Sequence, residues 1–302
     1  MHRLLKILLI ILFMVIFYCS NSYSTTRNIT AQSNFFSPST ISAFVGDTIR
    51  WIWINGSHTT TCDGSPLTSR PAGAAPWDAP LSSTIPSYRY IVTVAGTYNY
   101  ICLPHADIGM VGVINVSAAP ITLDLTTIIE GFWNGVIMVS DTVRVYLRSA
   151  VSPFSFVDSA KVKLNNLGNG ILTFTNAGSG SYYIVVTHRN SIETWSKLPQ
   201  SFTAGGTLSY NFTTSADKAY GNNLILKEGK YTIYSGDVNQ DGTVDLSDLS
   251  LIDNDAFNFV AGYIKTDLNG DNFIDLNDLS IADNNASNFV SKITPVQLTD
   301  SF

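Results

Sequence analysis

Charged residues are scarce in this chain: Asp, Glu, Lys and Arg make up 13% of its 302 residues, whereas 45% are hydrophobic. A chain with so much apolar surface can bury a core, which excludes an intrinsically disordered protein. Its 23 acidic side chains outnumber 17 basic ones, giving a formal net charge of −6. This balance argues against a nucleic-acid partner, whose phosphates attract basic surfaces. The length is sufficient for two or three domains.

Long apolar runs are scarce too, and the only one that approaches membrane length lies between residues 7 and 18. Arg3 and Lys6 precede it, and small residues follow it as far as Ser24. The run is too short for a spanning helix, and its flanks are typical of a secretory signal peptide. We therefore expect a signal peptide over residues 1–24, and a secreted mature protein without a transmembrane segment. Its location would be extracellular or cell-surface associated, with the periplasm as another possibility.

Cysteine and histidine are equally sparse, with three and four copies. Cys19 belongs to the apolar leader, which leaves Cys62 and Cys102. A disulfide between these two is the ordinary interpretation for a secreted chain. The residues around Cys102 favour a different role.

Residues 100–110 contain the pattern Cys-x2-His-x4-Met, with a further histidine upstream. Cys102, His105, Met110 and His58 together offer a thiolate, two imidazoles and a thioether, a full ligand set for one copper ion. This set suits both Cu(I) and Cu(II), so little has to move when an electron arrives or leaves. The chemistry that it favours is electron transfer.

The surrounding sequence predicts β-strands. Residues 45–58 read as a turn, a strand and a loop that delivers His58, and residues 88–94 and 97–102 read as two more strands. On these motifs, residues 28–117 resemble a cupredoxin (blue copper) domain, and the Cys-Leu-Pro-His and Gly-Met-Val-Gly runs resemble plastocyanins most closely. The resemblance implies a Greek-key β-sandwich that holds one type 1 copper ion. Ile101 departs from the pattern, because plastocyanins carry a tyrosine there, which puts their second electron-exit route in doubt.

The histidine count excludes catalytic copper proteins of related fold. His2 lies in the leader and His188 in another predicted domain, whereas multicopper oxidases need many histidines and binuclear sites need a second cysteine in the ligand loop. We therefore expect an electron carrier rather than an enzyme. A bridge from Cys62 to Cys102 would destroy the copper site, so we expect Cys62 to be a free thiol.

The C-terminal part contains a repeat, in which residues 237–260 align with residues 267–290. Each copy begins with Asp-x-Asn-x-Asp and carries another acid at loop position 12. Oxygen ligands at alternate positions of a tight loop wrap a hard cation, and a carboxylate at the start of the next helix closes the coordination sphere. Calcium is the cation that this pattern indicates.

The repeat lacks the entering helix of a full EF-hand, and each loop ends in Asp rather than Glu. At residues 235–295 it resembles a dockerin, a small all-α module with two EF-hand-type loops that binds cohesin domains. Asn272 replaces the usual turn glycine, but asparagine tolerates a left-handed backbone. The resemblance assigns Asp237, Asn239, Asp241, the Thr243 carbonyl and Asp248 to a first calcium ion, and Asp267, Asn269, Asp271, the Phe273 carbonyl and Asp278 to a second.

Residues 119–233 show hydrophobic alternation over 141–147, 160–164, 172–176 and 182–188, which predicts an antiparallel β-sandwich. His188, Arg189, Asn190, Glu193 and Trp195 could line a ligand surface there. No second acid, nucleophile or metal set accompanies them, so we interpret this domain as a spacer.

These patterns together predict a mainly β protein: a secreted type 1 copper protein that exchanges single electrons with a redox partner. A calcium-dependent dockerin-like module would attach it to an extracellular assembly, with a cohesin-like protein as the docking partner. The alternative is a non-redox structural or adhesion component with a degenerate cupredoxin domain. Electrons would pass through the edge of His105, within an apolar contact patch of Leu103, Pro104, Ile108 and Met110.

Overall fold

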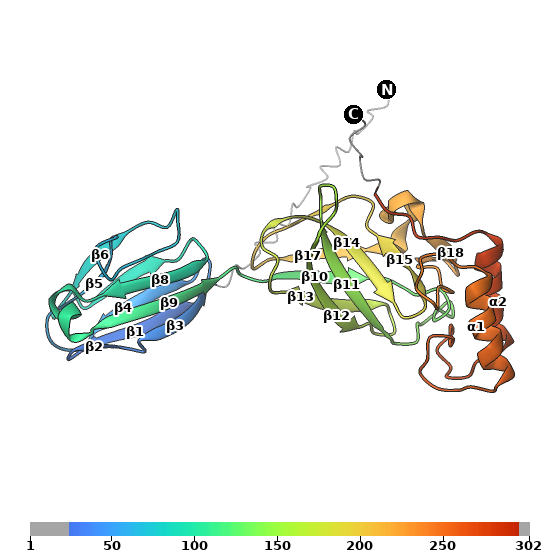
Figure 1. Cartoon of the computed structure of the whole chain (residues 1–302), viewed down its shortest axis with the longest axis horizontal. Coiled ribbons are helices and arrows are strands. Elements are labelled where there is room, and N and C mark those ends of the chain that lie inside the picture. The colour runs from blue at the N-terminus through green and yellow to red at the C-terminus, as the bar shows by residue number, and fades with distance from the viewer. Residues whose placement is uncertain (1–23, 296–302) are drawn as a thin grey trace, which may run out of the picture.

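The structure is a computed structural model that describes residues 24–295. The predicted signal peptide lies outside the described residues, apart from Ser24. Figure 1 shows a β-sandwich joined through one segment of chain to a larger body of strands and helices. Within residues 24–295, none of the helices combines the length and the apolarity needed to cross a bilayer.

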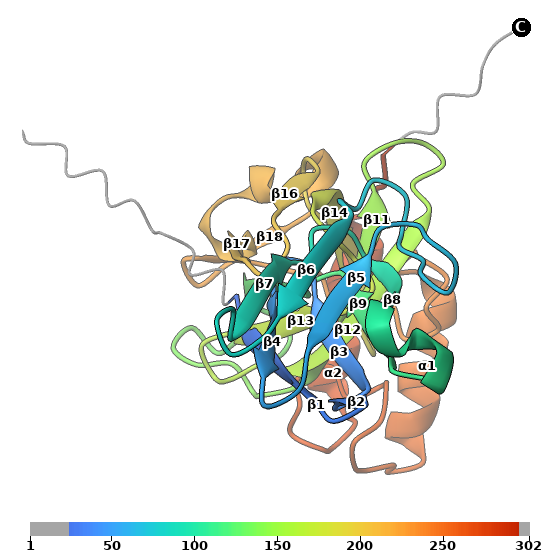
Figure 2. The ribbon, with the colours of Figure 1, turned by 90° about the vertical axis from the view of Figure 1, so that its left-hand side faces the viewer.

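The first β-sandwich, which Figure 2 places in front, consists of two sheets with strand orders β2-β1-β4-β7 and β3-β9-β8-β5-β6. Its strands are β1 (Thr26–Gln32), β2 (Phe35–Ser37), β3 (Thr40–Phe44), β4 (Thr48–Trp53), β5 (His58–Cys62), β6 (Trp77–Leu81), β7 (Ser87–Ile91), β8 (Gly96–Ile101) and β9 (Val111–Ser117). The pairs β1–β4 and β3–β9 are parallel, and the chain crosses to the other sheet at β3 and back at β4. The strands predicted from the sequence are confirmed as β4, β7 and β8.

Aromatic side chains fill the interior of this sandwich. Alternate residues of β4 and β8 point inward, and Trp51, Tyr98 and Tyr100 are fully buried. The Trp51 ring meets Tyr100 edge-on at 5.2 Å between centroids and Trp77 at 5.6 Å. Buried aromatic rings remove large apolar areas from water, so this cluster stabilises the sandwich strongly. Since Tyr100 lies two residues before Cys102, the core also fixes the strand end that carries the thiol.

The second β-sandwich has a three-stranded sheet, β13-β10-β17, and a five-stranded sheet, β12-β11-β14-β15 with β16 beside β14. Its strands are β10 (Ile121–Thr126), β11 (Thr142–Ser149), β12 (Phe156–Lys163), β13 (Asn169–Phe174), β14 (Gly180–His188), β15 (Ser191–Trp195), β16 (Gln200–Phe202) and β17 (Thr207–Asn211), followed by a separate hairpin of β18 (Ile225–Lys227) and β19 (Lys230–Thr232). The predicted sandwich is present, but β10 and β17 pair in parallel. β17 enters that sheet after the chain has crossed from β16 in the other one.

The C-terminal repeat forms two helices, α1 (Leu246–Phe257) and α2 (Leu276–Ser287). Each begins with a capping box of two aspartates, Asp245 with Asp248 and Asp275 with Asp278, which satisfies the free N–H groups of the first turn. The helices share a small core with their flanking loops, made of Val238, Val244, Ile252, Leu268, Ile274, Ala282 and Val290. Ile192 of β15 belongs to the same core, so the second sandwich supplies part of the helical module's interior.

Polar contacts also join the second sandwich to the helical module. The Glu130 carboxylate accepts hydrogen bonds from the Asn285 side-chain amide at 2.7 Å and from the Ser235 backbone N–H at 3.0 Å. The Asn190 side-chain amide donates to the Asp267 carbonyl at 2.8 Å. Glu130, Asn190 and Asn285 are buried, so breaking this interface would leave polar groups without partners. The second sandwich therefore does more than space the other parts, because it holds the helical module in place.

Gly131 offers a test of this interface, because a Cβ atom added there would lie 1.9 Å from the carbonyl oxygen of Leu268 in the helical module. We expect Gly131→Ala to force the two parts away from each other and to lower the free energy of unfolding by about 1–3 kcal/mol. Thermal unfolding and limited proteolysis near residue 268 measure the effect. Gly178→Ala is the matched control, since an added Cβ there has no neighbour within 4 Å. Equal stability of the two variants would contradict the tight contact.

Candidate metal centres

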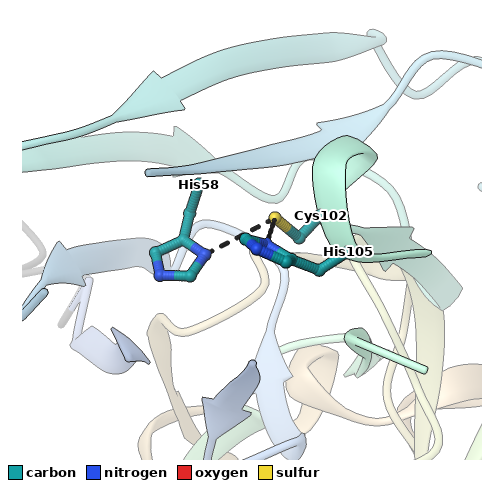
Figure 3. A group of neighbouring side chains, drawn as sticks. All are labelled: His58, Cys102 and His105. Carbon is teal, nitrogen blue, oxygen red and sulfur yellow. Dashed lines mark hydrogen bonds between the residues drawn. The ribbon is translucent and has the colours of Figure 1, made fainter. Parts of the chain in front are cut away.

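Two strand ends and one helical turn bring together the thiol and both imidazoles of the predicted copper site. His58 opens β5, Cys102 directly follows β8, and His105 lies in the 3-10 turn η1 (Leu103–Ile108). Figure 3 shows the three side chains converging. The Cys102 Sγ atom lies 3.6 Å from Nδ1 of His58 and 3.3 Å from Nδ1 of His105. The candidate ligand atoms all lie within 4.8 Å of one another.

Neighbouring backbone groups hold these donors in orientation. Nε2 of His58 lies 2.8 Å from the Asn55 carbonyl oxygen. A carbonyl only accepts, so Nε2 carries the proton and the Nδ1 lone pair faces Cys102. The Thr59 backbone N–H donates to the Cys102 sulfur at 3.4 Å, and the Leu103 N–H donates to the Thr59 hydroxyl oxygen at 2.9 Å. Hydrogen bonds of this kind fix the orientation of metal ligands and change their basicity.

Burial acts on both kinds of ligand. It is the largest cause that lowers the pKa of His58, which keeps that imidazole neutral and able to bind a metal. It is also the largest cause that raises the pKa of the Cys102 thiol, so the metal-free thiol stays protonated. A bound metal reverses the second effect, because a coordinating thiol loses its proton. The thiol, the imidazoles and their surroundings therefore fit a soft transition metal such as copper.

Met110 is tied to the same turn through its backbone. The Cys102 N–H donates to the Met110 carbonyl at 3.0 Å, and the Met110 N–H donates to the His105 carbonyl at 3.1 Å. The Met110 side chain is fully buried in the core cluster that includes Cys102. One expectation is therefore wrong: a fully buried Met110 contributes nothing to an exposed contact patch. Leu103, with 46% of its surface exposed, and Ile108, with 62%, remain.

Cys62 and Cys102 are both buried and both free, as the argument from the copper ligands predicted. The Cys62 thiol donates to the Ser69 carbonyl at 3.4 Å. Burial is the main cause that raises the pKa of Cys62 to about 11, so this thiol is unreactive at neutral pH.

The first acidic loop is tied to the start of α1 through Asp248. Asp248 accepts hydrogen bonds from the backbone N–H groups of Val238 at 2.9 Å and Asn239 at 3.0 Å. Oδ1 of the buried Asp237 has no hydrogen-bond partner. Burial, with the negative charges of Asp248 and Asp241, raises the pKa of Asp237 to about 6. A buried carboxylate in this setting is costly unless a cation accompanies it.

The second loop repeats this hydrogen bonding. Asp278 accepts from the N–H groups of Leu268 at 2.7 Å and Asn269 at 3.2 Å. Asn272 has φ 67°, the left-handed conformation expected where glycine is replaced. Thr243 and Phe273, the two predicted carbonyl ligands, each form a short antiparallel bridge, with Ser291 and Ala261 respectively.

The acidic side chains of neither loop converge as the copper ligands do. Among residues 24–295, only His58, Cys102 and His105 bring three His, Cys, Asp or Glu ligand atoms within 4.8 Å of one another. Two of the five predicted ligands in each loop are an amide and a backbone carbonyl, and the carboxylates repel one another without a cation.

The suggested ligand surface of the second sandwich is largely buried. His188 is 3% exposed and hydrogen-bonds through Nε2 to Asp141 at 3.1 Å and through Nδ1 to Ser191 at 3.0 Å. Asn190 is fully buried, and the Trp195 indole donates to Glu193 at 2.7 Å. The sequence singled out these residues but did not indicate that two of them, Arg189 and Asn190, lie at the contact with the helical module.

One protein family matches the part of the chain that forms the first sandwich. Residues 24–117 match the family of copper-binding proteins described as plastocyanin/azurin. Among solved structures, oxidised plastocyanin from Dryopteris crassirhizoma is 22% identical, with 30% of this chain and 99% of that chain covered at a TM-score of 0.25. A reduced amicyanin mutant is 25% identical, with 30% and 81% covered at a TM-score of 0.25. No curated protein matched the chain.

The state of the cysteines can be measured directly. We expect two free thiols per molecule when the mature, metal-free protein is unfolded and titrated without prior reduction. In the folded protein at neutral pH, Cys62 should resist alkylation because its pKa is raised to about 11. If the unfolded protein shows no free thiol and has the mass of a disulfide, Cys62 and Cys102 are paired, which would contradict both the free thiols and the copper site.

Proposed function

We propose that residues 24–117 bind one type 1 copper ion through His58, Cys102, His105 and Met110 and carry single electrons to and from a redox partner protein. The observation that carries this proposal is the convergence of the Cys102 thiol and both Nδ1 atoms within 4.8 Å. The match of these residues to the plastocyanin/azurin family supports it. When bound, copper supplies a one-electron redox couple.

The protein would contribute rigidity and a route to the surface. Asn55 fixes the His58 ring, Thr59 donates to the Cys102 sulfur, and the backbone of the turn ties Met110 to Cys102. Ligands held in this way change position little between oxidation states, which favours fast transfer. His58 is 2% exposed whereas His105 is half-buried, so His105 is the imidazole through which electrons pass.

The contact area for the redox partner would surround His105. Leu103, Pro104 and Ile108 are exposed in the same turn and offer an apolar surface. A patch of this kind allows close approach without desolvating charge. The ligand set uses His58 and His105, and His188 is hydrogen-bonded to Asp141 and Ser191 in the second sandwich, so we propose an electron carrier and not an enzyme.

We also propose that the two acidic loops bind calcium, one ion each, with the ligands given above. The support is the unpartnered buried oxygen of Asp237 in the first loop, together with the same pattern of hydrogen bonds around Asp248 and Asp278. Calcium prefers oxygen ligands of these kinds.

The helical module would then attach the chain to an extracellular assembly. Equivalent positions of the two repeats expose large apolar side chains: Leu246 and Leu276 are each 75% exposed, and Phe259 and Phe289 are 92% and 89% exposed. Exposed apolar groups of this size favour a protein partner, for which we propose a cohesin-like domain. The apolar leader over residues 1–24 suggests that the protein is exported. The proposed domains are residues 28–117, 119–233 and 235–295.

A visible spectrum tests the copper proposal. We expect Cu(II) loading of the full chain to give an intense blue band from charge transfer between the Cys102 thiolate and the metal. Cys102→Ser should abolish the band, and Cys62→Ser, which removes the other buried thiol, should leave it in place. A colourless wild-type protein that retains no copper would overturn the proposal and favour the non-redox structural alternative.

Thermal unfolding with calcium or with chelator tests the calcium proposal in the full chain. A ligand at 100 times its Kd adds about 2.7 kcal/mol of stability, so unfolding of the helical module should occur at a clearly higher temperature with calcium. The double variant Asp241→Asn with Asp271→Asn should lose this difference. Asp253→Asn with Asp283→Asn is the control, because both aspartates are exposed at equivalent positions of the helices. Identical unfolding of the wild type in both conditions would contradict calcium binding.

A further inference from the structure

The turn between β14 and β15 inserts against both acidic loops. The Gly236 N–H, just before the first loop, donates to the Asn190 carbonyl at 2.7 Å. The Asn190 side chain donates to the Asp267 carbonyl, at the first position of the second loop, at 2.8 Å. One turn of the second sandwich therefore contacts the start of both repeats.

Arg189 of this turn forms an ion pair with the second loop. Its Nε atom donates to the Asp141 carboxylate at 2.9 Å, and its Nη2 atom lies 3.4 Å from Oδ2 of Asp267. The guanidinium carbon lies over the Tyr263 ring at 4.4 Å and the Phe132 ring at 5.3 Å. The side chain is 12% exposed, so this positive charge is fixed in place and only weakly screened by solvent.

The corresponding aspartate of the first loop has no such partner. None of the ion pairs among residues 24–295 includes Asp237, and its Oδ1 atom is buried without a hydrogen bond. Asp267, in contrast, has the Arg189 guanidinium beside its carboxylate. Both loops carry four aspartates, so they do not differ in their own acidity. Lys292 lies beside Gly242 of the first loop, but it is exposed and belongs to none of the ion pairs among the described residues, whereas Arg189 is largely buried and paired with Asp267.

We propose that Arg189 makes the two loops unequal: the first binds calcium tightly, and the second binds it weakly because an ion there competes with the Arg189–Asp267 ion pair. This inference rests on the proposed calcium binding. A fixed unit charge within about 5 Å of a divalent ion weakens its binding by roughly tenfold or more, even with solvent screening. The second loop therefore depends less on calcium for its stability, because Arg189 of the second sandwich already balances the charge of Asp267.

Calorimetric titration of calcium into the metal-free full chain tests the inference. The wild type should show a tight step and a second step weaker by about tenfold or more. Asp241→Asn should remove the tight step and Asp271→Asn the weak one, because these exposed aspartates belong to the first and second loops. Arg189→Met should strengthen the weak step about tenfold. Arg144→Met is the matched control, since Arg144 hydrogen-bonds to Ser159 and contacts neither loop.

The outcomes separate this inference from the calcium proposal itself. Two equal steps, a tight step that disappears in Asp271→Asn, or an Arg189→Met variant that behaves like Arg144→Met would overturn the role of Arg189 and leave calcium binding intact. An absence of binding in every variant would overturn both. If circular dichroism shows that Arg189→Met does not fold, the two aspartate variants still test whether the first loop is the tight site and the second loop the weak one. Arg189→Lys, which keeps the charge, should then keep the second step weak.

Discussion

The contact between Trp51 and Tyr100 is the constraint on which the copper region depends. The two rings come from different sheets of the first sandwich and lie 5.2 Å apart, so they set the spacing of those sheets. Tyr100 precedes Cys102 by two residues, and Trp51 precedes the loop that ends at His58. Rigid packing of large side chains thus determines where a thiol and an imidazole meet, although neither ring contributes a ligand.

The second half of the molecule depends on buried polar contacts instead. Glu130, Asn190 and Asn285 lie in the interface between the second sandwich and the helical module, and each finds a partner across it. Such networks stabilise only when every member is satisfied, so they specify one arrangement of the two parts more strictly than apolar packing does. Ile192 completes the arrangement from the apolar side by entering the core of the module.

Local patterns predicted the features that are themselves local. The strands β7 and β8, the start of α1 and α2 after paired aspartates, and the convergence of Cys102 with His105 all follow from residues close together in the chain. His58 could be included because its loop follows a recognisable strand. The unpaired state of Cys62 followed from chemistry, since a disulfide and a copper thiolate exclude each other.

Contacts between distant segments were beyond such patterns. Arg189 and Asp267 are 78 residues apart, and nothing in the composition of either segment indicates that they meet. The burial of Met110 and the parallel pairing of β10 with β17 likewise depend on how complete sheets pack. The same limit applies to the middle of the chain, where alternation predicts a sandwich but not which edge of it holds another module.

The connection between the two sandwiches has a geometric consequence. Only three residues separate the end of β9 at Ser117 from the start of β10 at Ile121, a span of at most about 14 Å. β9 starts at Val111, beside the ligand turn, and runs for seven residues towards this connection, roughly 24 Å. A short connection thus joins the first sandwich to the second at the pole opposite His105. A molecule anchored through its C-terminal half would present its metal-binding pole outward, where a second protein can reach it without meeting the anchor (Figure 1).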